Sequence, residues 1–250
     1  MQRERDNYRP SQTIARLTTA APITGAEATR VAMLHALAAA TLSLSDPTLS
    51  MVEPYLRRFG GPKFANLKPL SMRYGDNLII HGNESLLDLR TPVLEDASAL
   101  HVSYDSGLNA TALLFIDIDA MKPPEDLSLP GHLGPFTHSM WDNCVGRPTA
   151  ADASTVTITP CRDCRSVKPY LKPGCARPQP NRYTFILFAQ SPAYTTVRGL
   201  PRATGKKFDL GAFATKNPEL RPVAVNYMLV HGTGKPRNKR RKLRQCRRRD

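Results

Sequence analysis

The stretch "NRYTFILFAQ", residues 181–190, constrains the fold more strongly than any other part of the sequence. It runs almost without a polar break from Tyr183 to Phe188, and it is rich in the aromatic and branched residues that favour strands. Continuous apolar runs of this length are typical of a strand whose two faces are both covered. We therefore expect residues 181–190 to form a central strand, paired on both sides.

Other parts of the chain also predict strands and few helices. Five further segments have strand character: 70–74, 77–82, 111–119, 154–160 and 221–230. Residues 208–216 predict one short helix, and the loop 168–180 is rich in proline and glycine. The pattern contains no regular alternation of strands with helices. It predicts a mostly-β domain, residues 66–232, with a few peripheral helices.

Residues 1–65 form an N-terminal region with a different character. Thr24 and Glu27 have the spacing of a capping box, and the Ala-rich run behind them predicts an amphipathic helix that ends at Asp46-Pro47. The first residues carry several arginines, as mitochondrial presequences do, although Glu4 and Asp6 do not fit that pattern. We find no apolar run long enough for a transmembrane helix and no apolar core of signal-peptide type.

The C-terminal segment 233–250 is strongly basic. Residues 235–250 hold ten Lys or Arg and one Asp, a charge of +9, which leaves +5 of the total +14 for the rest of the chain. Like charges at this density cannot fold on themselves, and they predict either a solvated tail or an arm that binds a polyanion such as RNA. The predicted RNA-binding residues are Lys235, Arg237, Lys239, Arg240, Arg241, Lys242, Arg244, Arg247, Arg248 and Arg249.

The five cysteines are an odd number, and we interpret them as free thiols in a reducing compartment. Cys161 and Cys164 have the spacing of a zinc-ligand pair, and Cys175 is a candidate third ligand. No second pair supplies the fourth ligand. We therefore predict no metal and no other cofactor.

Four ordered motifs resemble the phosphatidylethanolamine-binding protein (PEBP) family. They are "LLFIDIDA", "HSMWDNCVG", "NRYTFILFAQ" and "FDLGAFATKNPELRPVAVNYMLV", within a resemblance that spans about residues 66–231. The resemblance implies an antiparallel β-sandwich with Greek-key connections and a small anion pocket. It also implies that Asp117, His138 and Tyr183 line this pocket and that Asp119 braces it.

Several residues depart from the family pattern around that pocket. Ile118 and Met121 replace the two prolines of the family's "DPDAP" segment, and Asn181 replaces the His of "HRY". Arg177 and Pro178 stand where the family has a glycine-rich approach. These substitutions predict a vestigial pocket without a small-molecule ligand.

The resemblance and the basic segment together suggest a structural protein of the mitochondrial ribosome's large subunit, whose partners are rRNA and ribosomal proteins. The alternative is a free PEBP-type regulatory protein that binds an anionic ligand or inhibits a protease or kinase. Asp117 and His138 could act as acid and base, but no nucleophile, metal set or cofactor loop accompanies them, so we predict no enzyme.

Overall fold

The computed structural model describes residues 49–88, 90–120, 135–149, 152–174, 179–201 and 207–232, and the statements below concern these residues. The chain divides into two compact units, Met1–Leu44 and Ser45–Asp250, and every described residue belongs to the second. The predicted N-terminal helix and the basic segment 235–250 lie outside the described residues.

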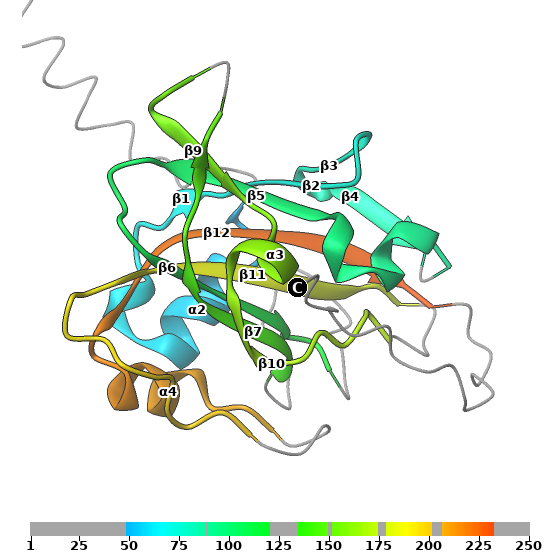
Figure 1. Cartoon of the computed structure of the whole chain (residues 1–250). Coiled ribbons are helices and arrows are strands. Elements are labelled where there is room, and N and C mark those ends of the chain that lie inside the picture. Colours follow the sequence, from blue (N-terminus) through cyan, green and yellow to red (C-terminus); the bar gives the residue numbers. More distant parts are fainter. Residues whose placement is uncertain are drawn as a thin grey trace, which may run out of the picture. The chain divides into compact units, whose positions relative to one another are not determined.

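A mixed seven-stranded sheet forms the middle layer of this unit (Figure 1). Its order is β1 (Lys68–Pro69), β12 (Leu220–His231), β11 (Asn181–Gln190), β6 (Thr111–Asp117), β7 (Phe136–Cys144) and β10 (Arg165–Lys168), with β4 (Gly82–Asp88) also on β12. β11 pairs antiparallel with both β12 and β6, whereas β1 and β4 pair parallel to β12. The expected central strand is confirmed, and the parallel pairs modify the expected antiparallel arrangement.

A second, antiparallel sheet lies across one face of the first. Its order is β3 (Leu78–Ile80), β2 (Ser71–Tyr74), β5 (Leu100–Asp105), β9 (Thr155–Ile158) and β8 (Arg147–Pro148). The opposite face of the large sheet is covered by α2 (Glu53–Gly60) and α4 (Leu210–Lys216) (Figure 1). The remaining short helical elements are η2 (Pro62–Phe64), η3 (Pro92–Glu95), η4 (Ala97–Ala99) and α3 (Pro160–Asp163).

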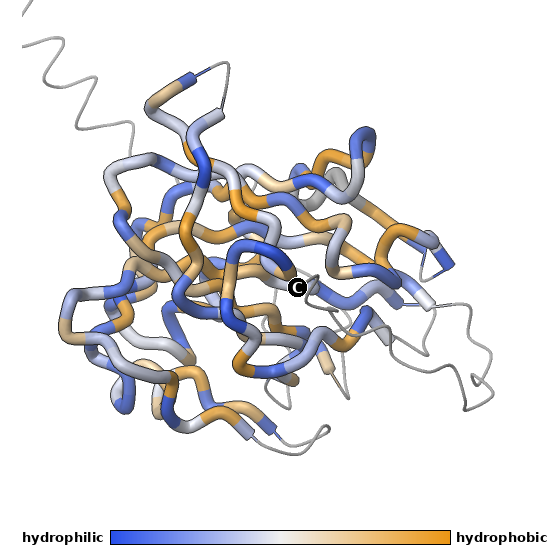
Figure 2. Tube along the Cα trace, in the orientation of Figure 1, coloured by the Kyte–Doolittle hydropathy of each residue, from blue (hydrophilic) through white to orange (hydrophobic). Residues whose placement is uncertain are grey.

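The core consists of two hydrophobic clusters, one on each face of the large sheet. Phe185 and Leu187 of β11 belong to the cluster between the two sheets, while Ile186 and Phe188 belong to the cluster beneath α2 and α4. Successive side chains of a strand point to opposite faces, so a strand covered on both faces must be apolar throughout. Figure 2 shows hydrophobic segments passing through the interior of the body. The mostly-β fold predicted from the sequence is therefore confirmed.

Local sequence signals explain where the two helices that cover the large sheet, α2 and α4, begin and end. α4 begins where the Asp209 carboxylate accepts the Ala212 N–H at 2.8 Å, as an N-cap should. α2 carries a proline in its first turn and is followed by the C-cap residue Gly61, whose positive φ of 82° favours glycine. Tyr55 and Leu56 of α2 are buried in the core, so this part of the predicted N-terminal region packs on the β body.

Candidate ligand site

Three neighbouring strands bring the predicted pocket residues together. Tyr183 on β11 lies directly opposite Asp117 on β6, and β7 lies on the other side of β6. The register between β6 and β7 shifts after the pair Phe115↔Ser139, which makes His138 the extra residue of a β-bulge. The bulge turns the imidazole towards its neighbours, with ring centroids 5.1 Å from Tyr183 and 5.2 Å from Phe115.

The Asp117 carboxylate is almost fully buried and is held by three donors. Its Oδ2 accepts from Asn181 Nδ2 at 2.8 Å, its Oδ1 accepts from the Asp119 N–H at 2.9 Å, and the Tyr183 hydroxyl also donates to it. Burial raises the pKa of Asp117 to about 7, while the hydrogen bond from Asn181 opposes this rise. The Asn181 substitution thus supplies a neutral amide to the carboxylate.

His138 is buried as a neutral ring. Its Nδ1 lies 2.8 Å from the carbonyl oxygen of Leu171. Because a carbonyl can only accept, Nδ1 carries the hydrogen and Nε2 keeps its lone pair. Burial lowers the pKa of His138 to about 4, although the carbonyls of Leu171 and Lys172 oppose the change. At neutral pH the imidazole therefore presents an acceptor, and it has no positive charge to attract an anion.

Tyr183 completes a closed set of hydrogen bonds. Its hydroxyl accepts the Gly174 N–H at 3.0 Å and donates to Asp117. Asp117 and His138 are each 4% exposed and Tyr183 is 1% exposed. Lys168 and Lys172, on the segment that supplies the Leu171 carbonyl, are engaged elsewhere, because Lys172 pairs with Glu95 and Lys168 Nζ donates to the Pro201 carbonyl at 2.9 Å. Within the described residues, the polar groups of this site thus bond mainly to one another and to backbone.

Asp119 lies beside the pocket residues, where it binds β11. Both of its oxygens contact the Arg182 guanidinium, at 2.6 and 2.7 Å, and Oδ2 also accepts the Arg182 backbone N–H at 2.9 Å. Arg182 Nη1 in turn donates to the Met51 carbonyl at 2.5 Å. This arrangement fixes the segment that follows β6, including buried Ile118. Met121, Arg177 and Pro178 lie outside the described residues.

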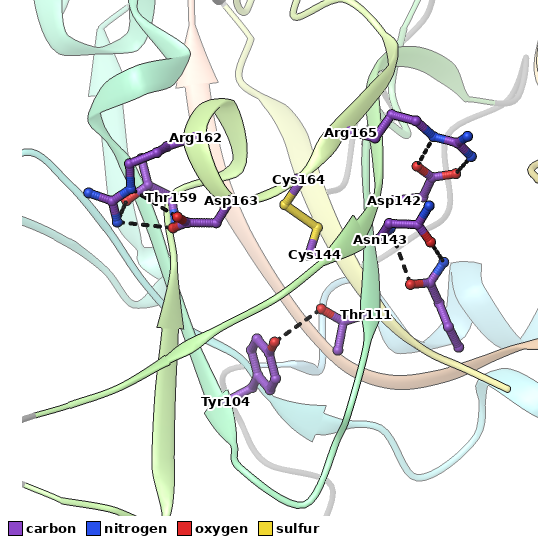
Figure 3. Close-up of a disulfide and its surroundings, with 11 residues drawn as sticks. Tyr104, Thr111, Asp142, Asn143, Cys144, Thr159, Arg162, Asp163, Cys164 and Arg165 are labelled. Atoms are coloured by element: carbon purple, nitrogen blue, oxygen red, sulfur yellow. Dashed lines mark hydrogen bonds and ion pairs between the residues drawn. A yellow bond between two sulfur atoms is a disulfide. The ribbon is translucent and has the colours of Figure 1, made fainter. Parts of the chain in front are cut away.

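The cysteines correct the expectation of free thiols. Cys144 and Cys164 form a disulfide (Figure 3), and Cys161 is also disulfide-bonded. The pairing of β10 with β7, in which Arg165 lies opposite Asp142, brings the first two cysteines together although 20 positions separate them in sequence. Their sulfurs are used in disulfides, so Cys161 and Cys164 cannot serve as the zinc ligands considered from their spacing. The third candidate, Cys175, lies outside the described residues.

A cavity of about 770 Å³ lies further along β11, away from Asp117. It is lined by Lys68 and Leu70, by the β5–β6 turn, by Leu187 and by the first residues of β12. Nothing in the sequence pattern predicted it, because its walls come from four separate segments.

No helix of the described part of the chain is both long and apolar enough to span a membrane. The predicted RNA-binding residues, Lys235 to Arg249, lie outside that part.

Comparison with known proteins identifies the fold. No protein-family model matches the sequence, and no curated protein matches it. Carboxypeptidase Y inhibitor, solved in complex with its cognate proteinase, superposes with a TM-score of 0.53 at 14% identity, over 77% of this chain and 98% of its own. The phosphatidylethanolamine-binding protein of Plasmodium falciparum gives 0.50 at 16% identity, over 75% and 99%. At these identities the likeness concerns structure alone, and it shows that the described body has the PEBP fold.

Proposed function

We propose that this chain is a non-catalytic binding protein, in which the PEBP-fold body is a rigid scaffold and residues 235–250 attach it to a polyanion. The observation that carries the proposal is the closed hydrogen bonding of Asp117, His138 and Tyr183. An anion receptor needs donors or cations directed at its ligand. Here a neutral imidazole offers a lone pair and the tyrosine hydroxyl is already used, which supports a role in macromolecular contacts.

The same geometry argues against acid–base catalysis. A general base must reach a substrate proton, and its neighbours must leave it room to do so. The Asp117 carboxylate accepts from three protein donors and is 4% exposed. No nucleophile stands next to His138 among its described partners, which are the backbone carbonyls of Leu171 and Lys172 and the rings of Phe115, Phe136 and Tyr183.

The attachment is tested by the salt dependence of RNA binding. If each cation of residues 235–250 that reaches a phosphate releases a counterion, the slope of log affinity against log salt steepens by roughly 0.7–0.9 per contact. Deleting 235–250 should weaken RNA binding and make this slope shallower by the amount that several phosphate contacts contribute, whereas thermal stability should hardly change. Filter binding of the full chain and the deletion variant, at several salt concentrations, measures the affinity and its salt slope, and thermal unfolding of the two forms measures the stability. Equal slopes would refute the role of this segment.

The specific form predicted from the sequence is a protein of the mitochondrial large ribosomal subunit. The basic segment 235–250, which has no aromatic residue for base stacking, is suited to sequence-independent contacts with rRNA phosphates. Sedimentation of the native protein from a mitochondrial lysate tests this form. Co-migration with large ribosomal particles is the expected result, and a protein that stays at the top of the gradient contradicts it.

A free PEBP-type regulatory protein is the second candidate, and the Cys144–Cys164 disulfide favours it. Disulfides persist in oxidising compartments and are rare in reducing ones. The disulfide therefore does not fit the reducing compartment that we inferred from the sequence. Calorimetry with phosphoethanolamine and inorganic phosphate tests its anion-binding form. Micromolar affinity that is lost in His138→Ala would support this candidate and would overturn the proposal of a vestigial pocket.

A further inference from the structure

Two Asn-x-Ser/Thr tripeptides occur in the chain, Asn83-Glu84-Ser85 and Asn109-Ala110-Thr111, and neither has proline in the middle. Such tripeptides accept N-linked glycans in chains that pass through the secretory compartments. The tripeptide is short enough to occur by chance, so its place in the fold decides its meaning. The first tripeptide falls within β4, and the second begins in the turn between β5 and β6 and ends at Thr111, the first residue of β6.

The position of Asn109 suits a glycan. The turn leaves β5 after Asp105 and enters β6 at Thr111, and Asn109 is exposed within it. Asp105 fixes the start of the turn, because its Oδ1 accepts the Gly107 N–H at 2.9 Å. A sugar on an exposed turn between two strands extends into solvent without displacing the core.

The third residue of the tripeptide is in the opposite situation. Thr111 is fully buried, lies opposite Cys144 in the β6–β7 ladder, and its hydroxyl donates to Tyr104 Oη at 3.3 Å (Figure 3). A transferase that reads the threonine hydroxyl can reach it only while β6 is unpaired. Modification of Asn109 must therefore precede the folding of the large sheet.

The disulfide provides an independent chemical marker of the same compartment. Cys144, opposite Thr111, is joined to Cys164, and Cys161 is disulfide-bonded as well. Cytosolic and nuclear compartments keep thiols reduced, whereas the compartment that attaches N-glycans also oxidises them. We propose that Asn109 carries an N-linked glycan, added before β6 pairs with its neighbours, and that the chain matures in an oxidising secretory compartment.

The decisive experiment uses the native protein from its own source. Free thiols are alkylated, the chain is digested without reduction, and the peptides are treated with peptide-N-glycosidase in heavy-oxygen water. We expect a heavy-oxygen aspartate at position 109 and a disulfide-linked peptide pair that contains Cys144 and Cys164. An unmodified Asn109 peptide, or alkylated Cys144 and Cys164, would overturn the proposal.

Variants of the full chain, expressed in cells of its source, locate the glycan. Asn109→Gln should abolish a glycosidase-sensitive shift at this turn, whereas Thr111→Ser, which keeps both the tripeptide and a hydroxyl, should retain it. Asn83→Gln is the matched control for the other tripeptide and should leave the Asn109 glycan in place. A glycan that survives Asn109→Gln and disappears in Asn83→Gln would contradict the assignment to Asn109.

This inference goes beyond the proposed binding of a polyanion and does not depend on it. It is incompatible with the mitochondrial ribosomal form of that function and compatible with the second candidate, a free regulatory protein. The salt slope of polyanion binding reports on residues 235–250 whether or not Asn109 is modified. A glycan at Asn109 together with a steep salt slope would support both proposals and would exclude the mitochondrial ribosome as the location. A bare Asn109 with a steep slope would overturn only the glycan proposal.

Discussion

Arg182 and Asp119 form a fully buried ion pair directly beside the candidate ligand site. The guanidinium contacts both carboxylate oxygens, at 2.6 and 2.7 Å, and both side chains are 0% exposed. Asp119 follows β6 and Arg182 lies in β11, so the pair fixes the chain two residues after Asp117. The position of the Asp117 carboxylate therefore depends on a contact made outside the site.

Replacing Arg182 with Leu should strongly destabilise the protein. The change leaves the Asp119 carboxylate buried without its cation, and losing one partner of a buried pair typically costs about 3–5 kcal/mol. Urea denaturation measures the free energy of unfolding. The control is Arg90→Leu, which breaks the exposed Arg90–Asp88 pair, whose arginine side chain is 77% exposed, and should change little. Similar losses in the two variants would contradict the special role of the buried pair.

Phe185→Ala tests the packing between the two sheets. Phe185 is 0% exposed and stacks on Phe115 of the neighbouring strand, with ring centroids 4.1 Å apart. Its truncation should cost about 3–5 kcal/mol, because the surrounding sheets cannot close the cavity. Ile79→Ala is the matched control, since Ile79 is 54% exposed and should contribute little. Thermal or urea unfolding compares the two, and equal effects would mean that the sheets repack around position 185.

The double variant Cys144→Ala/Cys164→Ala should lose about 3 kcal/mol of stability, the value expected for a closed loop of this size. The disulfide joins residues 20 positions apart and restricts the unfolded chain. Cys164→Ala alone breaks the same bond and keeps the buried Cys144 side chain, so it is the control for packing. If the constraint matters most, the single and double variants should unfold at nearly the same urea concentration. A much larger loss in the double variant would assign the effect to packing.

The sequence predicts the parts of the fold that depend on apolar pattern. β11 is continuous in apolar residues because both faces are covered, and it was expected from residues 181–190. β7 was missed as a strand, because it buries polar residues such as Ser139 and Asp142. These residues are satisfied only by distant partners: the Ser139 hydroxyl donates to the Lys168 carbonyl, and Asp142 pairs with Arg165.

The candidate site shows the same limit. The family resemblance indicated Asp117, His138 and Tyr183, and the structure places them on three adjacent strands. Their hydrogen bonding could not be predicted, because it depends on the bulge at His138 and on the course of the loop that supplies the Leu171 carbonyl. The disulfide was missed for a related reason. Only the register of β7 against β10 brings Cys144 and Cys164 together.

Asp117 and His138 should change stability with pH in opposite directions. Burial raises the pKa of Asp117 to about 7, compared with about 3.9 in an unfolded chain. The folded state holds the Asp117 proton more tightly than the unfolded chain does. The stability that this proton binding adds to the folded state is therefore full below about pH 4 and is lost as the pH rises through about 7. Burial lowers the pKa of His138 to about 4, compared with about 6.5 when unfolded. That contribution is full above about pH 6.5 and is lost as the pH falls through about 4.

These two effects should largely cancel in the unmodified protein, and single variants should reveal each one. In Asp117→Asn the free energy of unfolding should rise between about pH 4 and 6.5, because only the His138 effect remains. In His138→Gln it should fall between about pH 4 and 7, and each slope can approach about 1.4 kcal/mol per pH unit. Urea denaturation at a series of pH values measures the slopes, and a uniform loss of stability in either variant does not alter them. Slopes that match the unmodified protein in both variants would mean that neither group titrates differently on folding, and the shifted pKa values described here for Asp117 and His138 would be wrong.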